Sequence, residues 1–432
     1  MSTAPRQTSD RSALSVPHLQ EAPRLDSRVS WRVLIGCCVL AFVSMSSLFG
    51  SSFGLFMRPL EEEMRWTRSE IAFSLTILML MSPFAAPATG WVIDHLRLRP
   101  LVLWGVVLQS ANLVALSLMQ GAVWVFYLTS GAMLITGAGA SLLALSKVVQ
   151  SWFDRSLGRA LGVLFACAAA GAIVHPMLVQ ALIAQAGWRG ALAAMGGLSL
   201  VCGGLAAWWV VEERANVAPL AVDHADARPN APRAESWLAT LTKSRAWWVL
   251  SFWNMLFAFG SGSIGIHLAA LLQDRGATPS QSAMALSLMG VGALIGNLAA
   301  GWLIDRTSAR RLAGLVMLLP MSAALLLYAG AGYEFAMLAA VALGLSTGTD
   351  GSLCAFLAQR FFGASLFGRA SATQMIAVSL GGGLSPWLSG LLRESSGSYQ
   401  FSLIMAAAAF GLAAASAIWL PDPQQSTGLS AD

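Results

Sequence analysis

The segments GWVIDHLRLRP (residues 90–100) and GWLIDRTSARR (residues 301–311) are two copies of one pattern, and the architecture of the chain follows from them. Their aspartates, Asp94 and Asp305, lie 211 residues apart. An offset of 211 or 210 residues also relates Gly54 and Gly265, Thr67 and Thr278, Ser69 and Ser280, Arg159 and Arg369, Gly171 and Gly381, Pro176 and Pro386, and Gly187 and Gly397. An offset that stays nearly constant over this length predicts a duplicated unit.

Apolar segments fill most of the chain. Of its 432 residues, 56% are hydrophobic and only 11% are charged, against about 25% charged in an average soluble domain. So few charges cannot cover a water-facing surface, and lipid is therefore the expected solvent. A membrane helix needs about 20 apolar residues to cross ~30 Å of hydrocarbon. This rule predicts spans at 31–57, 70–93, 100–119, 123–147, 158–184, 188–211, 246–272, 280–303, 311–330, 334–358, 368–392 and 399–420.

The predicted fold is an all-α polytopic membrane protein with twelve transmembrane helices in two pseudo-symmetric six-helix bundles. The bundles cover residues 31–211 and 246–420, and a polar linker rich in Pro and Ala joins them over residues 212–245. Residues 1–30 are expected to form a disordered cytoplasmic tail, and residues 421–432 a cytoplasmic C-terminal tail. Substrate sites in folds built from such repeats lie near the membrane midplane, between the repeats.

Lysine and arginine predict the orientation. With the N-terminus inside, 20 of the 26 Lys and Arg residues fall in cytoplasmic loops and tails, and 6 fall on the other side. Positively charged loops resist translocation, so this bias is typical of a correctly oriented protein. We therefore expect a multi-pass protein of the cell (inner) membrane with both termini cytoplasmic.

Several classes of function lack their motifs in this sequence. There is no G-x-x-x-x-G-K-[ST] loop and no CxxC spacing, and the five cysteines fall inside apolar stretches. No nucleophile–base pair indicates an enzyme, and no basic run with interleaved aromatics indicates nucleic-acid binding. We therefore expect no catalytic residue, metal, cofactor or nucleic-acid partner, and an ion gradient as the source of energy.

Four segments of the sequence carry a resemblance to known families. The paired segments at 90–100 and 301–311 resemble the G-x-x-x-D-R/K-x-G-R-R/K loop of the major facilitator superfamily, although neither copy keeps the inner Gly and His95 replaces a common basic residue. The stretches SSFGLFMRPLEEEMRWTRSEI (51–71) and WFDRSLGRALGVLFACAAAGAIVHP (152–176) are similar to those of monocarboxylate porters and oxalate/formate exchangers, with an SFG-x-F first span and W-S/T-R-S opening the second. The resemblance implies transport by alternating access.

The sequence also departs from that narrower group. A basic residue can precede the SFG motif there, whereas this chain has Ser51. Spans 280–303 and 368–392 carry no Lys or Arg at depth, although relatives use charged residues in the eighth and eleventh spans. A carboxylate substrate usually requires a cation, so the departures bear on the substrate and not on the fold.

A gate is predicted at the cytoplasmic seam, where a carboxylate followed by cations recurs in both halves. Such groups can pair with each other and with helix ends, and the pairs can break as the halves rock. The alternative interpretation is that the cations only reflect the positive-inside bias. The predicted gating residues are Asp94, Arg97, Asp305, Arg306, Arg159 and Arg369.

Ionisable residues at membrane depth are candidates for function because each costs several kcal/mol to insert. Asp350, within GLSTGTDGSLCAF (344–356), is the first candidate for substrate or proton binding, with packing against nearby hydroxyl groups as the alternative. His175 and His267 could titrate near neutral pH or be neutral core residues. Arg58 could attract an anion from outside or could pair with the following acidic run. Asn254, Asn297 and Gln374 complete the set of candidate contacts.

The favoured function is proton-coupled uptake of a small organic anion, such as a monocarboxylate, by a monomer in the lipid bilayer. Protons are the expected coupling ion, and the preference for this substrate class follows mostly from the resemblance. One alternative is an exporter of amphipathic compounds by proton antiport, because Gly162, Gly171 and Pro176 partly fit the fifth-span pattern of such antiporters. A second alternative is a transporter-like receptor that binds without transport.

Overall fold

The computed structural model describes residues 28–96, 98–154, 156–210, 234–330 and 332–420. The first half of the described chain consists of helices joined by short connections. Its elements are α1 (Arg28–Phe42), α2 (Met45–Leu48), η1 (Gly50–Ser52), α3 (Phe53–Met64), α4 (Arg68–His95), α5 (Leu98–Ser117), α6 (Val123–Thr136), η2 (Ala138–Ala140), α7 (Leu142–Trp152), α8 (Leu157–Leu198), the π-helical turn η3 (Ser199–Gly203) and α9 (Gly204–Val210).

The second half repeats this plan. Its elements are α10 (Ala234–Lys243), α11 (Arg245–Gly265), α12 (Leu268–Asp274), α13 (Pro279–Arg306), α14 (Ala309–Tyr328), α15 (Tyr333–Ser396), α16 (Gln400–Ser416) and η5 (Ala417–Trp419). Helix α8 bends at Gly187 and α15 bends at Gly363, so each carries two of the predicted crossings. Among the described residues, eight helices are long and apolar enough to cross a membrane by themselves, or up to ten if each of two bent helix pairs is one span. The predicted fold class is confirmed.

The repeat is visible at the helix ends. Thr67 caps α4 in a capping box with Glu70, and Thr278 caps α13 in the same way with Gln281. In each box the Thr hydroxyl accepts the N3 amide while the N3 side chain accepts the N-cap amide, which satisfies two otherwise unpaired donors. Matching caps at an offset of 211 residues give the second crossing of each half the same start.

Gly187 and Gly397, which the repeat also pairs, both have positive φ angles, at 68° and 73°. Such angles strongly favour glycine because it lacks a Cβ atom. Both residues make the turn between the fifth and sixth crossings of their half. The duplicated sequence therefore fixes the same reversal of the chain twice.

Two spans that the hydrophobic pattern predicts as continuous are broken. The first bends by 44° between α1 and α2, and the seventh bends by 43° between α11 and α12. The first break lies in VSMSSLFGSS (43–52) and the second follows GSGSIG (260–265). Serine competes for backbone hydrogen bonds and glycine adds backbone freedom, so both weaken a helix at these points.

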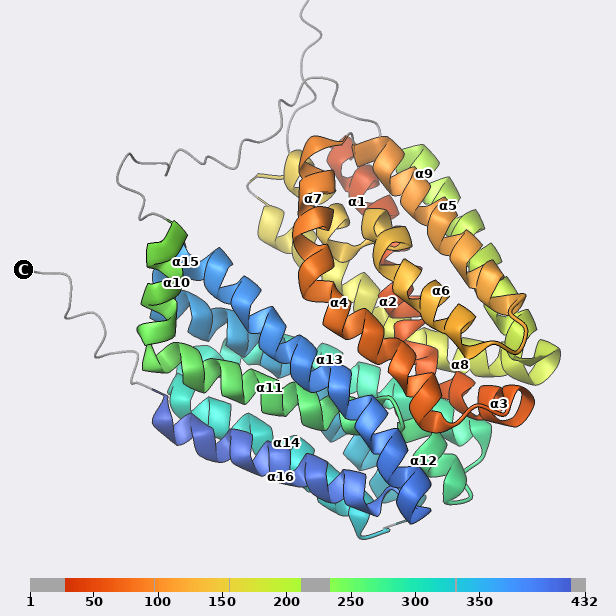
Figure 1. Ribbon diagram of the computed structural model, residues 1–432. Coiled ribbons are helices and arrows are strands. Elements are labelled where there is room, and N and C mark those ends of the chain that lie inside the picture. Colours follow the sequence, from red (N-terminus) through yellow and green to blue (C-terminus); the bar gives the residue numbers. More distant parts are fainter. Residues whose placement is uncertain (1–27, 97, 155, 211–233, 331, 421–432) are drawn as a thin grey trace, which may run out of the picture.

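The two halves lie side by side and converge at one end (Figure 1). We call the end that carries α3 and α12 the distal end, and the end where α1 begins and α16 finishes the proximal end. Helix α4 packs against α15, and α8 packs against α13, so these four helices form most of the contact between the halves, and α3 packs against α12 at its edge. In Figure 1 the ribbons of the two halves diverge toward α7 and α10 at the proximal end.

The predicted linker is partly helical. Helix α10 occupies residues 234–243 of it and packs against α11, with Leu241 fully buried. Residues 211–233 lie outside the described residues, as do 1–27 and 421–432, on which most of the predicted tails fall. Helix α1 already begins at Arg28, inside the range that the sequence assigned to the N-terminal tail.

Candidate functional site

Arg68, the first residue of α4, joins the halves at the distal end. Its Nη1 donates to Asp274 Oδ2 at 2.7 Å and its Nη2 to Asp274 Oδ1 at 2.8 Å, so the guanidinium and the carboxylate meet in a two-pronged pair. Asp274 is the last residue of α12, in the second half. Arg68 is only 3% exposed, and paired charge-assisted hydrogen bonds of this kind are among the stronger polar contacts in proteins.

The same arginine has two more partners. Its Nε donates to Glu61 at 2.9 Å, within the first half, and Nη1 also donates to the Tyr399 hydroxyl at 3.0 Å. That hydroxyl lies 3.0 Å from His267 Nδ1, while His267 Nε2 lies 2.8 Å from the Pro386 carbonyl. A carbonyl only accepts, so Nε2 carries the proton and Nδ1 accepts from Tyr399. Both nitrogens of neutral His267 are thereby satisfied.

Glu394 closes the distal end beside this pair. Its carboxylate accepts the Ser69 amide at 2.8 Å and the Ser69 hydroxyl at 3.1 Å. Ser69 lies in the first turn of α4, where unpaired amides and the helix dipole favour a negative charge. A carboxylate of the second half therefore satisfies the start of a first-half helix. We refer to Arg68, Ser69, Asp274, Glu394 and Tyr399 as the distal cluster.

Further hydrogen bonds join α4 and α15 below the distal cluster. Thr76 Oγ1 donates to the Gly383 carbonyl at 2.6 Å, and the hydroxyls of Ser82 and Ser379 lie 3.1 Å apart. These contacts extend from the distal cluster to the middle of α4. They hold the distal parts of the two halves together.

A polar cluster lies near the middle of the second half. Asn254 Nδ2 donates to Gln374 Oε1 at 3.0 Å and to Cys354 Sγ at 3.2 Å, and Gln374 Nε2 donates to Ser251 Oγ at 3.0 Å. The structure thus brings together two predicted site residues, Asn254 and Gln374, from the seventh and eleventh crossings. Both are buried.

Asp350 lies one helical turn before Cys354 on α15, next to this cluster. Its Oδ1 is buried and has no hydrogen-bond partner among the described residues. Asn297 of α13 is exposed, and its backbone packs against Gly348, two residues before Asp350. A buried carboxyl oxygen without a partner is costly unless it takes up a proton or a ligand.

His175 contacts the break in the first span. Its Nδ1 lies 2.9 Å from the Ser47 carbonyl, and its ring packs edge-on against Phe42 at 4.7 Å between centroids. The carbonyl accepts, so Nδ1 carries the proton and Nε2 presents a lone pair. Nε2 is buried without a partner in the described structure, and the residue is fully buried. His175 is therefore a buried base, whereas the two nitrogens of His267 are occupied.

Arg58 does not belong to the distal cluster. It pairs with Glu62 one turn later on α3 at 2.8 Å, and the two side chains are 47% and 65% exposed. Exposed pairs of this kind contribute little to stability. This contact agrees with the alternative in which Arg58 pairs with the acidic run. The buried distal cation is Arg68, which sequence reasoning missed as a site residue although the WTRS motif contains it.

Half of the six predicted gating residues have side chains that the structure does not describe. Arg97 and the side chains of Asp94 and Asp305 are not described. Arg306 lies over the Trp302 ring at 4.2 Å, and Arg369 lies over the Trp237 ring of α10 at 5.5 Å. Arg159 is exposed near the start of α8. The gate stays a prediction.

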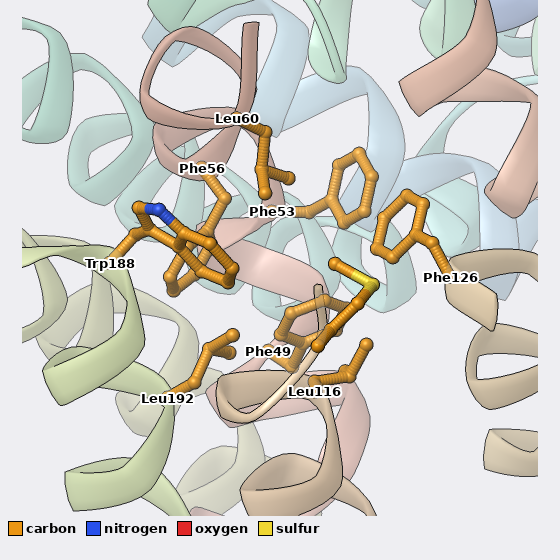
Figure 2. Close-up of a pocket in the computed structure, with 9 residues that line it drawn as sticks. Phe49, Phe53, Phe56, Leu60, Leu116, Phe126, Trp188 and Leu192 are labelled. Carbon is orange, nitrogen blue, oxygen red and sulfur yellow. The ribbon is translucent and has the colours of Figure 1, made fainter. Parts of the chain in front are cut away.

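An apolar void lies inside the first half (Figure 2). Its volume is about 10 Å³, which is at or below the space that one water molecule needs. Figure 2 shows side chains from several helices converging on it, namely Phe49, Phe53, Phe56, Leu60, Leu116, Phe126, Trp188 and Leu192. A void this small and apolar is a packing feature and cannot hold a solute.

Two six-crossing halves, closed together at one end and carrying polar groups at mid-depth, have the architecture of a membrane transporter. The family model described as Major Facilitator Superfamily matches residues 37–268 and 250–431. The chain therefore belongs to the major facilitator superfamily. The expectation that it is not an enzyme agrees with this membership.

Similar curated proteins fall in the monocarboxylate transporter group. The chain is 26% identical to monocarboxylate transporter 11 of Mus musculus over 87% of its length and 84% of that protein. It is 27% identical to monocarboxylate transporter 13 of Rattus norvegicus, over 90% and 88%. An uncharacterized MFS-type transporter, YcxA of Bacillus subtilis (strain 168), is 27% identical over 66% and 68%. The predicted resemblance to this group is confirmed.

Solved structures share the fold. The nucleoside transporter NupG, as a D323A mutant, superposes with a TM-score of 0.72 at 13% identity, over 90% of this chain and 99% of that one. A bacterial homolog of the human lysosomal transporter Spinster, inward-facing and unoccupied, gives a TM-score of 0.69 at 13% identity, over 91% and 95%. At this identity the likeness supports the fold alone.

Proposed function

We propose that this transporter works by alternating access and couples proton movement to the uptake of a small organic anion, such as a monocarboxylate. The observation that carries the proposal is the distal closure between the halves, formed by Arg68, Asp274 and Glu394. In the orientation predicted from the Lys and Arg bias, the distal end faces outward. The structure would then be the state closed to the outside, and breaking the distal cluster would open it.

The preference for an organic anion rests on the relatives named monocarboxylate transporters and on the polar groups at mid-depth. Asn254 orients the amide of Gln374, whose Nε2 has one N–H beyond its bond to Ser251 that can donate to a carboxylate. Asp350 lies beside this cluster. A second carboxylate can approach Asp350 only when a proton neutralises one of the two, because like charges disfavour joint ionisation. Binding of an anion and of a proton would therefore be linked at this site.

Two groups are suited to carry the proton. Asp350 has a buried oxygen without a partner, and His175 has a buried lone pair at Nε2. They lie in different halves, so protonation at either would change the charge on one side of the contact between the halves. His175 also contacts Phe42 and Ser47, on either side of the break in the first span, so its charge could alter the shape of that span.

Transport by purified protein in liposomes tests the proposal. Radiolabelled L-lactate and pyruvate serve as probes, with the liposome interior more alkaline than the outside. We expect uptake that exceeds that of protein-free liposomes, rises with the pH difference and is abolished by a protonophore. The Asp350→Asn variant is the matched control, since it keeps the shape of the side chain but cannot titrate. Absent carboxylate uptake, together with exchange of lipophilic cations for protons, would favour the exporter instead.

A further inference from the structure

The Arg68 side chain binds Asp274 in the geometry that recognises a free carboxylate. Two parallel N–H groups, on Nη1 and Nη2, reach the two carboxylate oxygens at 2.7 and 2.8 Å. The planar guanidinium matches a carboxylate in this way, whereas a lysine ammonium offers only a point charge. Next to it, the Ser69 amide and hydroxyl hold a second carboxylate, that of Glu394. The closed distal end therefore contains two protein carboxylates on first-half donors.

Opening of the distal end would separate these partners, because they belong to different halves. Asp274, Glu394 and Tyr399 move with the second half, and Arg68 and Ser69 move with the first. Arg68 keeps its Nε bond to Glu61, which is 2.9 Å long and lies within the first half. Its Nη1 and Nη2 edge and the Ser69 donors lose their partners.

Two of the three second-half groups, Asp274 and Tyr399, keep partners of their own. Asp274 lies 3.4 Å from Arg393 Nη2, and Arg393 Nε is buried with no hydrogen-bond partner among the described residues. The Tyr399 hydroxyl keeps His267 at 3.0 Å. Opening therefore leaves unmet donors on the first half, while Asp274 and Tyr399 stay hydrogen-bonded. Unmet donors on a cation are a binding site for an anion.

We propose that the Nη1 and Nη2 edge of Arg68, together with the Ser69 amide, is the carboxylate-binding site that the transported anion meets when the distal end opens. Asp274 and Glu394 take its place when the distal end closes, so closure displaces the anion toward the mid-depth groups. This inference rests on the proposed transport of an organic anion and adds the residues that receive it. The repeat supplies no second copy, because Pro279 stands where the offset of 211 residues would place an arginine.

The site also supplies a cation, which the predicted spans lack at membrane depth. Spans 280–303 and 368–392 carry no Lys or Arg at depth, and Arg58 is exposed and paired with Glu62. Among the described residues, Arg68 is the buried cation at the contact between the halves. A carboxylate substrate usually requires a cation, and Arg68 offers one whose carboxylate partners in the second half separate from it on opening.

Binding measurements on the full chain in detergent test this proposal. The Asp274→Asn/Glu394→Gln double variant removes both competing carboxylates and keeps the shape of their side chains. Thermal unfolding is followed with increasing acetate and L-lactate, because a ligand that binds the folded state raises its stability in proportion to RT ln(1 + [L]/Kd). Acetamide and lactamide are neutral controls of the same shape. Arg68→Gln and Arg68→Lys are then added separately to the double variant.

We expect the double variant to bind the acids at least about tenfold more tightly than the parent, since no protein carboxylate competes, which corresponds to an added ~1.4 kcal/mol. Arg68→Gln should abolish this gain, and Arg68→Lys should lose most of it while keeping the charge. An equal affinity in parent and double variant, an equal response to the amides, or full binding after Arg68→Gln would each overturn the site. Uptake of L-lactate by the parent decides the proposed function independently, because the function can hold while the site fails.

Discussion

Replacement of Asp274 by asparagine should shift the protein toward a state that is open at the distal end. The substitution replaces the two-pronged ion pair with at most one hydrogen bond from the Arg68 guanidinium to a neutral acceptor, because an amide presents only one acceptor oxygen. A hydrogen bond to a charged group contributes about 1.5–3 kcal/mol. The Arg68 and Asp274 side chains are 4% and 29% exposed, so solvent screens the pair only weakly. Loss of ~2 kcal/mol from the closed state changes the ratio of open to closed molecules by about thirtyfold.

Distances between spin labels measure this shift. Labels at Gln120, between α5 and α6, and Gln400, at the start of α16, report the separation of the halves at the distal end, and both positions are exposed. The five native cysteines are replaced first. We expect a longer-distance population in Asp274→Asn that is minor in the parent. Glu62→Gln is the control, because it removes an exposed pair within α3 and crosses no contact between the halves. An unchanged distance distribution in Asp274→Asn would refute the role of this pair as the distal closure.

Three further substitutions give distinct outcomes. His175→Asn keeps a donor at the position of Nδ1 for the Ser47 carbonyl but removes Nε2. Uptake driven by a pH difference should therefore fall by about tenfold or more, while exchange at equal pH continues. Paired flux assays check this. Asp350→Asn should make carboxylate uptake independent of pH between 5 and 8, as a pH series of initial rates will show. Gly390→Ala should hold the distal end open, because a Cβ atom there would lie 2.6 Å from the Ser69 Cα atom; the spin-label distances report it.

Two of these substitutions, His175→Asn and Gly390→Ala, have matched controls. His175→Gln places an amide near Nε2 and loses the Ser47 contact, so it separates the proton site from the structural hydrogen bond. Gly301→Ala adds a Cβ atom with nothing within 4 Å, and it should leave the distances unchanged. Uptake by His175→Asn that keeps its full pH dependence would remove His175 from the coupling mechanism. If the spin-label distances of Gly390→Ala match those of the parent, the added Cβ atom is accommodated at the contact with Ser69 and does not hold the distal end open.

The candidate site could be predicted only in part. Sequence reasoning found Asn254, Gln374 and Asp350 because polar groups in apolar spans are conspicuous, and the structure places Asn254 against Gln374. It did not find Arg68, because an arginine at the start of a span reads as an interface residue when its partner is unknown. Arg58 drew attention instead, since it ends the first span beside an acidic run. Arg68 and Arg58 differ in burial, and the hydrophobic pattern of a single span does not reveal which of the two side chains is buried.

The sequence by itself determined the number of crossings, their division into two halves and the positions of the helix caps. These properties are local, because an apolar run of about 20 residues must cross the bilayer wherever it is placed, and the capping boxes at Thr67 and Thr278 involve neighbours three residues away. The constant offset of the repeat then related equivalent residues in the two halves.

The tertiary structure alone decided which charges meet and which spans break. Arg68 and Asp274 are separated by 206 residues and belong to different halves, so their pairing depends on how the two bundles pack. The same is true of Glu394 at the start of α4 and of His175 against the break after α1. Such contacts form where burial makes unpaired polar groups costly, and burial is a property of the packed bundles that no single segment carries.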